Sequence, residues 1–159
     1  MNVSKNVIKL PITAINEHVI AKPIVACREE EIEKLLDDIH TAARNKTYIP
    51  QTATEENPDL SELYVFEEED QEFILCDLST SNFVGKIKDV GKGAKRRKQN
   101  GLPQEYLYVF QYSCKLCKRY EGNGKEQELE DILIYIKINN RTVPYKRIIV
   151  VSFHKNNPR

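Results

Sequence analysis

The sequence predicts a single α+β domain in which a small antiparallel sheet, built from the C-terminal strands, packs against N-terminal helices. Two apolar runs support the sheet, Ile132 to Asn139 and Arg147 to His154, because each has the length of a strand and many β-branched residues. The turn-prone residues 139–144 between them predict a hairpin. Residues 28–44 predict a helix, since their apolar side chains recur at spacings of three and four.

Length and composition are those of one ordinary domain. The chain has 159 residues, no formal net charge and a hydrophobic content of 40%, which suffices for a real core. No apolar stretch approaches membrane-spanning length, and the first residues lack the features of a signal peptide, so we expect a cytoplasmic protein with no membrane partner. The cysteines are too few and too scattered for a disulfide framework, and we expect reduced thiols at Cys27, Cys76, Cys114 and Cys117.

Residues 1–27 are predicted to form an N-terminal extension, and residues 28–159 the single domain. Within the extension, residues 18–20 and 24–27 are candidates for a strand at a sheet edge, where its prolines are tolerated. The helix of residues 28–44 has acidic residues early and a basic residue late, as the helix dipole prefers. We expect its apolar stripe to lie on the hairpin: Ile32, Leu35, Leu36, Ile39 and Ala43.

The middle of the chain predicts further helices. Asn57-Pro58 is a typical helix start, and residues 67–78 indicate a helix with an acidic first turn. Residues 79–82 are expected to cap another helical segment, beginning near Phe83 and continuing into a basic tract that ends as a mobile loop.

A third strand is predicted for residues 106–114, whose aromatic side chains alternate with others. A polar excursion, residues 115–130, follows it and leads into the hairpin.

Alternation assigns the two faces of the hairpin. In its first strand, the uniformly apolar set must face the core: Ile132, Ile134, Ile136 and Ile138. The opposite set is Leu133, Tyr135, Lys137 and Asn139. In the second strand, alternation groups Ile148, Val150, Ser152 and His154 against Arg147, Ile149, Val151 and Phe153. Tyr135, Lys137 and His154 then share a surface, provided that the register brings them side by side.

Charge is separated along the sequence. Residues 47–85 contain no Lys or Arg, and acidic residues cluster in the block of residues 55–77, which we interpret as a solvated helical surface. The tract of residues 86–98 has seven basic side chains against one acidic: Lys86, Lys88, Lys92, Lys95, Arg96, Arg97 and Lys98. Such a field can attract a polyanion, so the tract is either an RNA-backbone contact or a solvated loop.

Five residues are candidates for RNA cleavage without a metal ion: Lys86, Gln104, Tyr135, Lys137 and His154. RNA breaks its own backbone when the 2′-hydroxyl is deprotonated, the phosphate charge is neutralised and the leaving 5′-oxygen is protonated. A Tyr or a His can transfer the protons, while Lys and Gln can donate to the developing charge. In the plainer alternative, Tyr135 and Lys137 form a solvated strand face and His154 is a surface residue near the terminus.

Short motifs resemble the MqsR family of ribonuclease toxins (motility quorum-sensing regulator). They are ILCDLSTSNF at residues 74–83 followed by Lys86, Gln104-Glu105 before a strand, IYIKI at residues 134–138, and VVSFH at residues 150–154. The resemblance implies a RelE-like α+β fold, cleavage of single-stranded mRNA without metal, and neutralisation by a cognate antitoxin protein.

Carried over by the resemblance, the active-site residues of the family fall on Tyr135, His154, Gln104 and Lys86. The match at Lys86 needs a shift of one residue, because Gly85 occupies the directly counted position. The resemblance then implies that Tyr135 transfers a proton or anchors the phosphate and that His154 is the acid. Lys86, Lys137 and Gln104 would bind the scissile phosphate, and the remaining basic residues of the tract would bind RNA.

Two other functions compete with this hypothesis. A non-catalytic immunity-type or regulatory protein could use the acidic block to dock a basic partner, and a plain RNA- or DNA-binding module would need the basic tract but not Tyr135. Neither gains from a Tyr, a Lys and a His gathered on one face. Cys114-Lys-Leu-Cys117 could be half a zinc site, but no second pair follows at a standard spacing, so we expect no metal and no cofactor.

Overall fold

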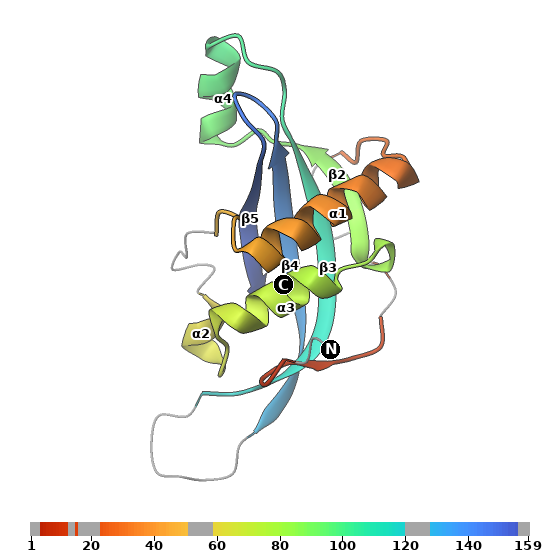
Figure 1. The fold of residues 1–159 in the computed structure, drawn as a ribbon, viewed down its shortest axis with the longest axis vertical. Coiled ribbons are helices and arrows are strands. Elements are labelled where there is room, and N and C mark those ends of the chain that lie inside the picture. Colours follow the sequence, from red (N-terminus) through yellow and green to blue (C-terminus); the bar gives the residue numbers. More distant parts are fainter. Residues whose placement is uncertain (1–3, 13–14, 16–22, 51–58, 120–127, 156–159) are drawn as a thin grey trace.

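The computed structural model describes residues 4–12, 15, 23–50, 59–119 and 128–155, and it confirms the predicted α+β class (Figure 1). The strands are β1 (Ile8–Lys9), β2 (Phe83–Lys88), β3 (Tyr106–Cys117), β4 (Leu129–Arg141) and β5 (Arg147–Lys155). The helices are α1 (Glu29–Asn45), α2 (Leu60–Leu63), α3 (Glu68–Asp77) and α4 (Lys92–Gln99), with a 3-10 turn at η2 (Thr80–Asn82).

The five strands form one antiparallel sheet with β3 at its centre. β4 pairs with one edge of β3, and β5 pairs with the outer side of β4. The other edge of β3 is shared by β2 near its start and by β1 near its end. The predicted hairpin and third strand are confirmed, but β3 and β4 extend into the expected polar excursion, whose centre at residues 120–127 lies outside the described residues.

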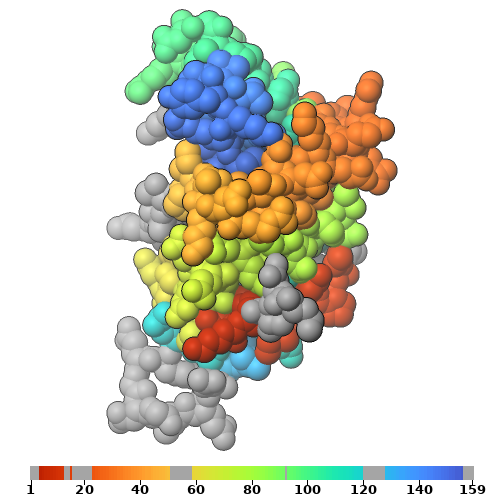
Figure 2. Space-filling model, in the orientation of Figure 1, coloured from red at the N-terminus to blue at the C-terminus, as the bar shows by residue number. Residues whose placement is uncertain are grey.

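One face of the sheet, here called the helix face, is covered by α1 and α3, which lie side by side across it (Figures 1 and 2). The predicted stripe of α1 is buried there, as are Ile74 and Leu75 of α3. From the sheet, the four isoleucines of β4 and the aromatic side chains of Phe110 and Tyr112 complete this core. The opposite side is called the back face and carries Leu107, Val109 and Gln111 of β3 with Leu133, Tyr135 and Lys137 of β4.

Local signals explain where the helices begin and end. α1 has three acidic residues in its first turn and ends at Lys46, whose φ of 56° is left-handed. α3 begins with a capping box between Glu67 and Asp70, which confirms the helix predicted for residues 67–78. The proposed start at Asn57-Pro58 lies outside the described residues, and α2 is capped instead by Asp59, whose carboxylate accepts from the backbone N–H of Ser61 at 2.9 Å.

The prediction that a helix begins near Phe83 is wrong, because residues 83–88 form strand β2. Ser79 and Asn82 do form a capping box, but it closes only the single turn of η2. The chain then turns onto the edge of β3, where the Asn82 amide donates to the backbone oxygen of Gln111 at 3.0 Å.

The basic tract is also more ordered than expected. Its second half is helix α4, not a mobile loop. α4 stands at the end of the sheet beside the turn between β4 and β5 (Figure 1).

Strict alternation fails in β5, because the strand contains one extra residue. Ile138 pairs with Val150 and Lys137 pairs with Ser152, so Val151 is a bulge. Ile148, Val150 and Phe153 are therefore all buried on the helix face, whereas Ser152 and His154 belong to the back face with Lys137 and Tyr135. The predicted grouping of Ile148 and Val150 with His154 is wrong for this reason.

Part of the expected N-terminal extension joins the sheet. β1 pairs with β3, and Val7 is buried in the main core. The side chains of Ser4 and Asn6 both donate to the buried carboxylate of Asp70 at the start of α3. Of the two candidate edge strands, residues 18–20 lie outside the described residues, and residues 24–27 contribute one bridge, between Val25 and Lys86.

Candidate nucleic-acid interface

Tyr135 and His154 are direct neighbours across the hairpin. They are cross-strand partners in β4 and β5, and the next pair along the same face is Lys137 with Ser152. Partners in an antiparallel pair have side chains close together on one face. The register therefore brings Tyr135, Lys137 and His154 to the common surface that the sequence predicted.

The hydroxyl of Tyr135 is buried. The side chain is only 5% exposed and packs in a small apolar cluster on the back face with Val109, against which Ile15 of the N-terminal segment also rests. Burial raises the pKa of Tyr135 to about 12, and among the described residues its hydroxyl has no hydrogen-bond partner. At neutral pH Tyr135 is therefore a proton donor with an unused O–H group, not a base.

His154 is half-buried, and a backbone contact fixes its tautomer. Its Nδ1 lies 3.0 Å from the carbonyl oxygen of Lys155. Because a carbonyl oxygen can only accept, Nδ1 carries the hydrogen of this contact. Nε2 is then the nitrogen that can gain or lose a proton beside Tyr135.

Lys86 does not belong to this group, and the expectation that it lies beside Tyr135 is wrong. Its partner in the sheet is Tyr108, so its side chain lies on the helix face. There its Nζ lies 2.7 Å from Glu31 Oε2 and 4.5 Å from the ring centroid of Tyr106. Burial opposes ionisation of Glu31, but hydrogen bonds from Lys86 and Tyr108 hold the pKa of its carboxyl below the usual value.

Gln104 is also separated from Tyr135. It immediately precedes Glu105, which lies at the end of the sheet near Arg141. Tyr135 and Arg141 are six residues apart in β4, which is roughly 20 Å at about 3.3 Å per residue. Of the predicted catalytic residues, the structure thus brings Tyr135 and His154 together and leaves Lys86 and Gln104 elsewhere.

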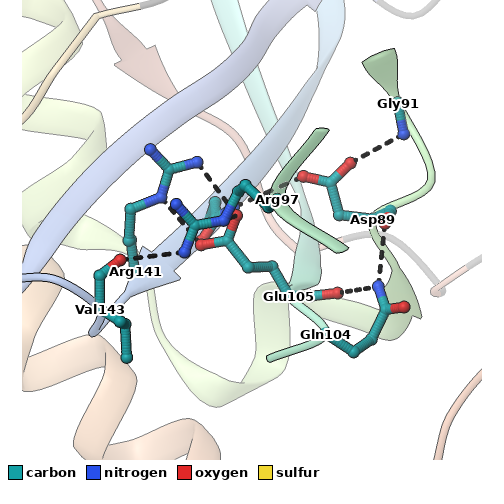
Figure 3. Close-up of polar contacts among 8 residues, drawn as sticks. Asp89, Gly91, Arg97, Gln104, Glu105, Arg141 and Val143 are labelled. Atoms are coloured by element: carbon teal, nitrogen blue, oxygen red, sulfur yellow. Dashed lines mark hydrogen bonds and ion pairs between the residues drawn. The ribbon is translucent and has the colours of Figure 1, made fainter. Parts of the chain in front are cut away.

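Partly buried charges attach the basic helix α4 to the sheet (Figure 3). Arg141 donates two hydrogen bonds to the Glu105 carboxylate, from Nε at 2.8 Å and from Nη2 at 3.0 Å. Arg97 of α4 forms an ion pair with the same carboxylate at 2.9 Å and donates to the carbonyl oxygen of Val143 at 2.9 Å. Burial would raise the pKa of Glu105, but the hydrogen bonds and charges of Arg141 and Arg97 hold it below its usual value.

This attachment divides the basic tract into two kinds of residue. Arg97 is a structural cation whose side chain is only 15% exposed, whereas Lys88, Lys95, Arg96 and Lys98 are exposed and can meet a phosphate backbone. Sequence reasoning missed Glu105 and Arg141. The signal available was Arg141 itself, which continues the polar set of β4 beyond Asn139.

The cysteines give no sign of a shared site. Cys114 is fully buried in the core, and burial raises the pKa of its thiol to about 12. Cys117 lies three residues further along β3, hence on the opposite face. Within the described ranges, no group of three or more His, Cys, Asp or Glu side chains is placed to hold a metal ion.

No family model, curated protein or solved structure matches this chain. In the described part of the chain, none of the helices combines the length and the apolar character needed to cross a membrane.

Proposed function

We propose that the protein is a metal-independent endoribonuclease that cleaves single-stranded RNA at the back face of the hairpin. The observation that carries the proposal is the register that pairs Tyr135 with His154 beside Lys137. These side chains supply a neutral hydroxyl donor, an imidazole and a cation on one surface. The motif resemblance to the MqsR toxins implies the same reaction.

Each group has a role in transphosphorylation. The 2′-oxygen of the RNA attacks the adjacent phosphorus and its proton passes to solvent, while the bond to the 5′-oxygen breaks. Tyr135 donates a hydrogen bond to the phosphate, and Lys137 offsets its added negative charge. His154, protonated at Nε2, gives that proton to the departing 5′-oxygen. The products are a 2′,3′-cyclic phosphate and a 5′-hydroxyl.

Access to Tyr135 requires a local rearrangement, because its hydroxyl is buried in the described structure. Ile15 packs against the cluster that contains Tyr135, so the Ile15 side chain must move off this surface before a phosphate can reach it. Substrate binding and displacement of Ile15 are thereby coupled.

The test is cleavage of a mixed-sequence single-stranded RNA in EDTA. The wild-type protein should cleave it and leave 2′,3′-cyclic ends. Tyr135→Phe should lose about 10²–10³ in rate, as the loss of one hydrogen-bond donor to the developing charge typically costs. His154→Ala should lose about 10²–10⁴, as the loss of a proton-transfer group typically costs. Arg28→Ala, at an exposed position before α1, is the matched control. Full activity in a folded Tyr135→Phe, His154→Ala double variant would refute this assignment.

The burial of Tyr135 favours a second candidate, an RNA-binding module that does not cleave. In that case the exposed cations of α4 bind the backbone and the hairpin is scaffold only. RNA binding with strong salt dependence, together with no cleavage by the wild type in EDTA, would favour this function.

A ribonuclease that is active on cellular mRNA must be inhibited in the cell that makes it, and we propose that a cognate antitoxin protein is the inhibitor. Expression of the wild-type chain alone should then arrest growth, while expression of Tyr135→Phe should not. A growth arrest that Tyr135→Phe reproduces in full would contradict a toxin that acts through this site.

A further inference from the structure

A cavity of about 480 Å³ lies between α4 and the segment that leads into β3. Its apolar lining comes from Val90, Ala94, Leu102 and Pro103. Cavities of this size bind small organic groups, which an apolar wall covers and a few polar atoms orient. Neither the Tyr135 and His154 pair nor the main core includes these residues.

The shape of the cavity is set by the end of α4. Gly101, with a φ of 73°, ends the helix, and the N–H of Leu102 then donates to the carbonyl oxygen of Arg97 at 3.0 Å. This closure directs Leu102 back toward the helix. The ion pair of Arg97 with Glu105 fixes the opposite wall to the sheet, so the cavity is preformed.

Gln104 provides a fixed hydrogen-bond acceptor in the wall. Its Nε2 donates to the carbonyl oxygens of Asp89 at 2.9 Å and Glu105 at 2.7 Å (Figure 3). Since both of those oxygens can only accept, the amide has one orientation, and its Oε1 remains as an acceptor. An exposed glutamine held by two hydrogen bonds is pre-organised to recognise an N–H group.

Cations stand around the same cavity. Lys95 and Lys98 line it and are exposed, and their spacing of three residues places them on one side of α4. If a planar group occupied the cavity, an anion attached to it would therefore lie beside the ammonium groups of Lys95 and Lys98. Apolar walls, an N–H acceptor and flanking cations together match a nucleobase joined to phosphates.

The hollow continues toward the hairpin. A second cavity, of about 140 Å³, shares Arg97, Pro103, Gln104 and Glu105 with the first, and Tyr106 and Tyr108 are among its other lining residues. Aromatic rings provide stacking surfaces for bases. Two adjoining cavities fit two neighbouring nucleotides of a chain better than a single free small molecule.

We propose that the cavity under α4 holds one base of a single-stranded RNA, with the neighbouring phosphates at Lys95 and Lys98. The inference builds on the proposed function by naming a recognition subsite for the same substrate. The cavity adjoins Glu105, roughly 20 Å along the sheet from Tyr135, so the bound base is not the one next to the scissile phosphate. The subsite determines where RNA binds, whereas the residues of the hairpin cleave it.

The test uses mononucleotides, so that it does not depend on cleavage. AMP, CMP, GMP and UMP are titrated into ¹⁵N-labelled protein, with ribose 5-phosphate and inorganic phosphate as probes that lack the base. We expect the amide signals of Ala94, Leu102 and Gln104 to shift with at least one nucleotide and not with ribose 5-phosphate. Equal shifts with ribose 5-phosphate, or none with any nucleotide, would overturn the subsite.

Two variants sharpen the assignment. Ala94→Phe fills the cavity and should weaken nucleotide binding at least tenfold, while its spectrum elsewhere shows that it remains folded. Lys95→Gln combined with Lys98→Gln should weaken binding and reduce its dependence on salt, because two phosphate contacts are lost. Lys34→Gln removes one positive charge, half of that change, from an exposed position on α1 and should leave nucleotide binding unchanged. Undiminished nucleotide binding in a folded Ala94→Phe variant would contradict the proposal.

Failure of the subsite and failure of the nuclease are separable. Nucleotide binding by a wild-type protein that does not cleave RNA in EDTA would leave the subsite standing and refute the proposed reaction. If the wild type cleaves RNA and Ala94→Phe changes neither the cleavage rate nor the sequence preference, the proposed reaction stands and the subsite is refuted.

Discussion

Lys86 and Tyr135 lie on opposite faces of the sheet, although only β3 separates their strands. Lys86 pairs with Tyr108 on the helix face, and Tyr135 pairs with Gln111 on the back face. A phosphate bound at one of these faces cannot contact the other, because the sheet lies between them. Lys86 therefore connects the start of α1 to the edge of the sheet through Glu31 and has no place in the Tyr135 site.

Replacing Lys86 should affect stability and not cleavage. Lys86→Met keeps the apolar stem but removes the ammonium that Glu31 contacts, so we expect the free energy of unfolding to fall by about 1–2 kcal/mol. RNA cleavage at saturating substrate should stay within twofold of the wild type. Denaturant unfolding and the EDTA assay measure the two effects. A folded variant of normal stability that no longer cleaves RNA would show that Lys86 takes part in catalysis.

Tyr135→Phe should leave the protein as stable as before, or more stable by up to about 1 kcal/mol. The reason is that the deleted hydroxyl is buried and has no partner among the described residues, so no hydrogen bond is lost with it. Tyr112→Phe is the matched control, since that hydroxyl donates to Asp77 at 2.7 Å and its removal should cost about 1 kcal/mol. Thermal unfolding of both variants checks this. A strong destabilisation by Tyr135→Phe would reveal a hydrogen bond that the described contacts lack.

The attachment of α4 should weaken in acid. The pKa of Glu105 is lowered below the ordinary 4.5, so its contribution to stability is fully present above that pH and is lost as the pH falls through the lower, folded value. Glu105→Gln removes this contribution at every pH and leaves Arg97 and Arg141 without their carboxylate, at a cost of about 3 kcal/mol.

Hydrogen exchange can locate this effect. In Glu105→Gln at neutral pH, the amides of α4 should exchange faster while those of α1 keep their protection. The difference in unfolding free energy between the variant and the wild type should shrink below pH 4.5. A constant difference across that range would mean that Glu105 is not the titrating group.

The Ile15 side chain should control the pKa of Tyr135. Burial raises the pKa of this phenol to about 12, and Ile15 is packed on the cluster that buries it. Ile15→Ala should therefore lower the pKa toward the ordinary value of 10.0 and, by easing access, raise the rate of RNA cleavage. Tyrosine ring ¹³C signals followed against pH measure the first effect. An unchanged pKa would show that other residues bury the hydroxyl.

Local periodicity was enough to predict α1, α3 and the terminal hairpin. The stripe of α1 and the isoleucines of β4 bury one continuous face each, so composition and spacing agree with the final packing. The same reasoning placed Tyr135 and Lys137 on the polar side of the hairpin. The pairing of Tyr135 with His154 was conditional on the register, which only the structure shows.

The position of Lys86 and the conformation of the basic tract depend on interactions that the spacing of residues in the sequence does not reveal. Between Phe83 and Gly85 the register shifts by one residue, so Val84 is extra and Lys86 moves to the helix face. Without that bulge, alternation from Phe83 would have placed Lys86 on the side of Tyr135. The second half of the basic tract is helix α4, and its Arg97 contacts Glu105 and Val143, two partners from other parts of the chain.

The extra residue at Val151 also matters for any comparison of this chain with another sequence. Val150, Ser152 and Phe153 occupy three successive positions opposite Ile138, Lys137 and Ile136, so Val151 can be removed without changing which side chains face inward. A one-residue gap there aligns this strand with a regular strand of eight residues, and His154 then keeps its position opposite Tyr135. A relative that lacks Val151 would thus carry the same pair with a shorter spacing in its sequence.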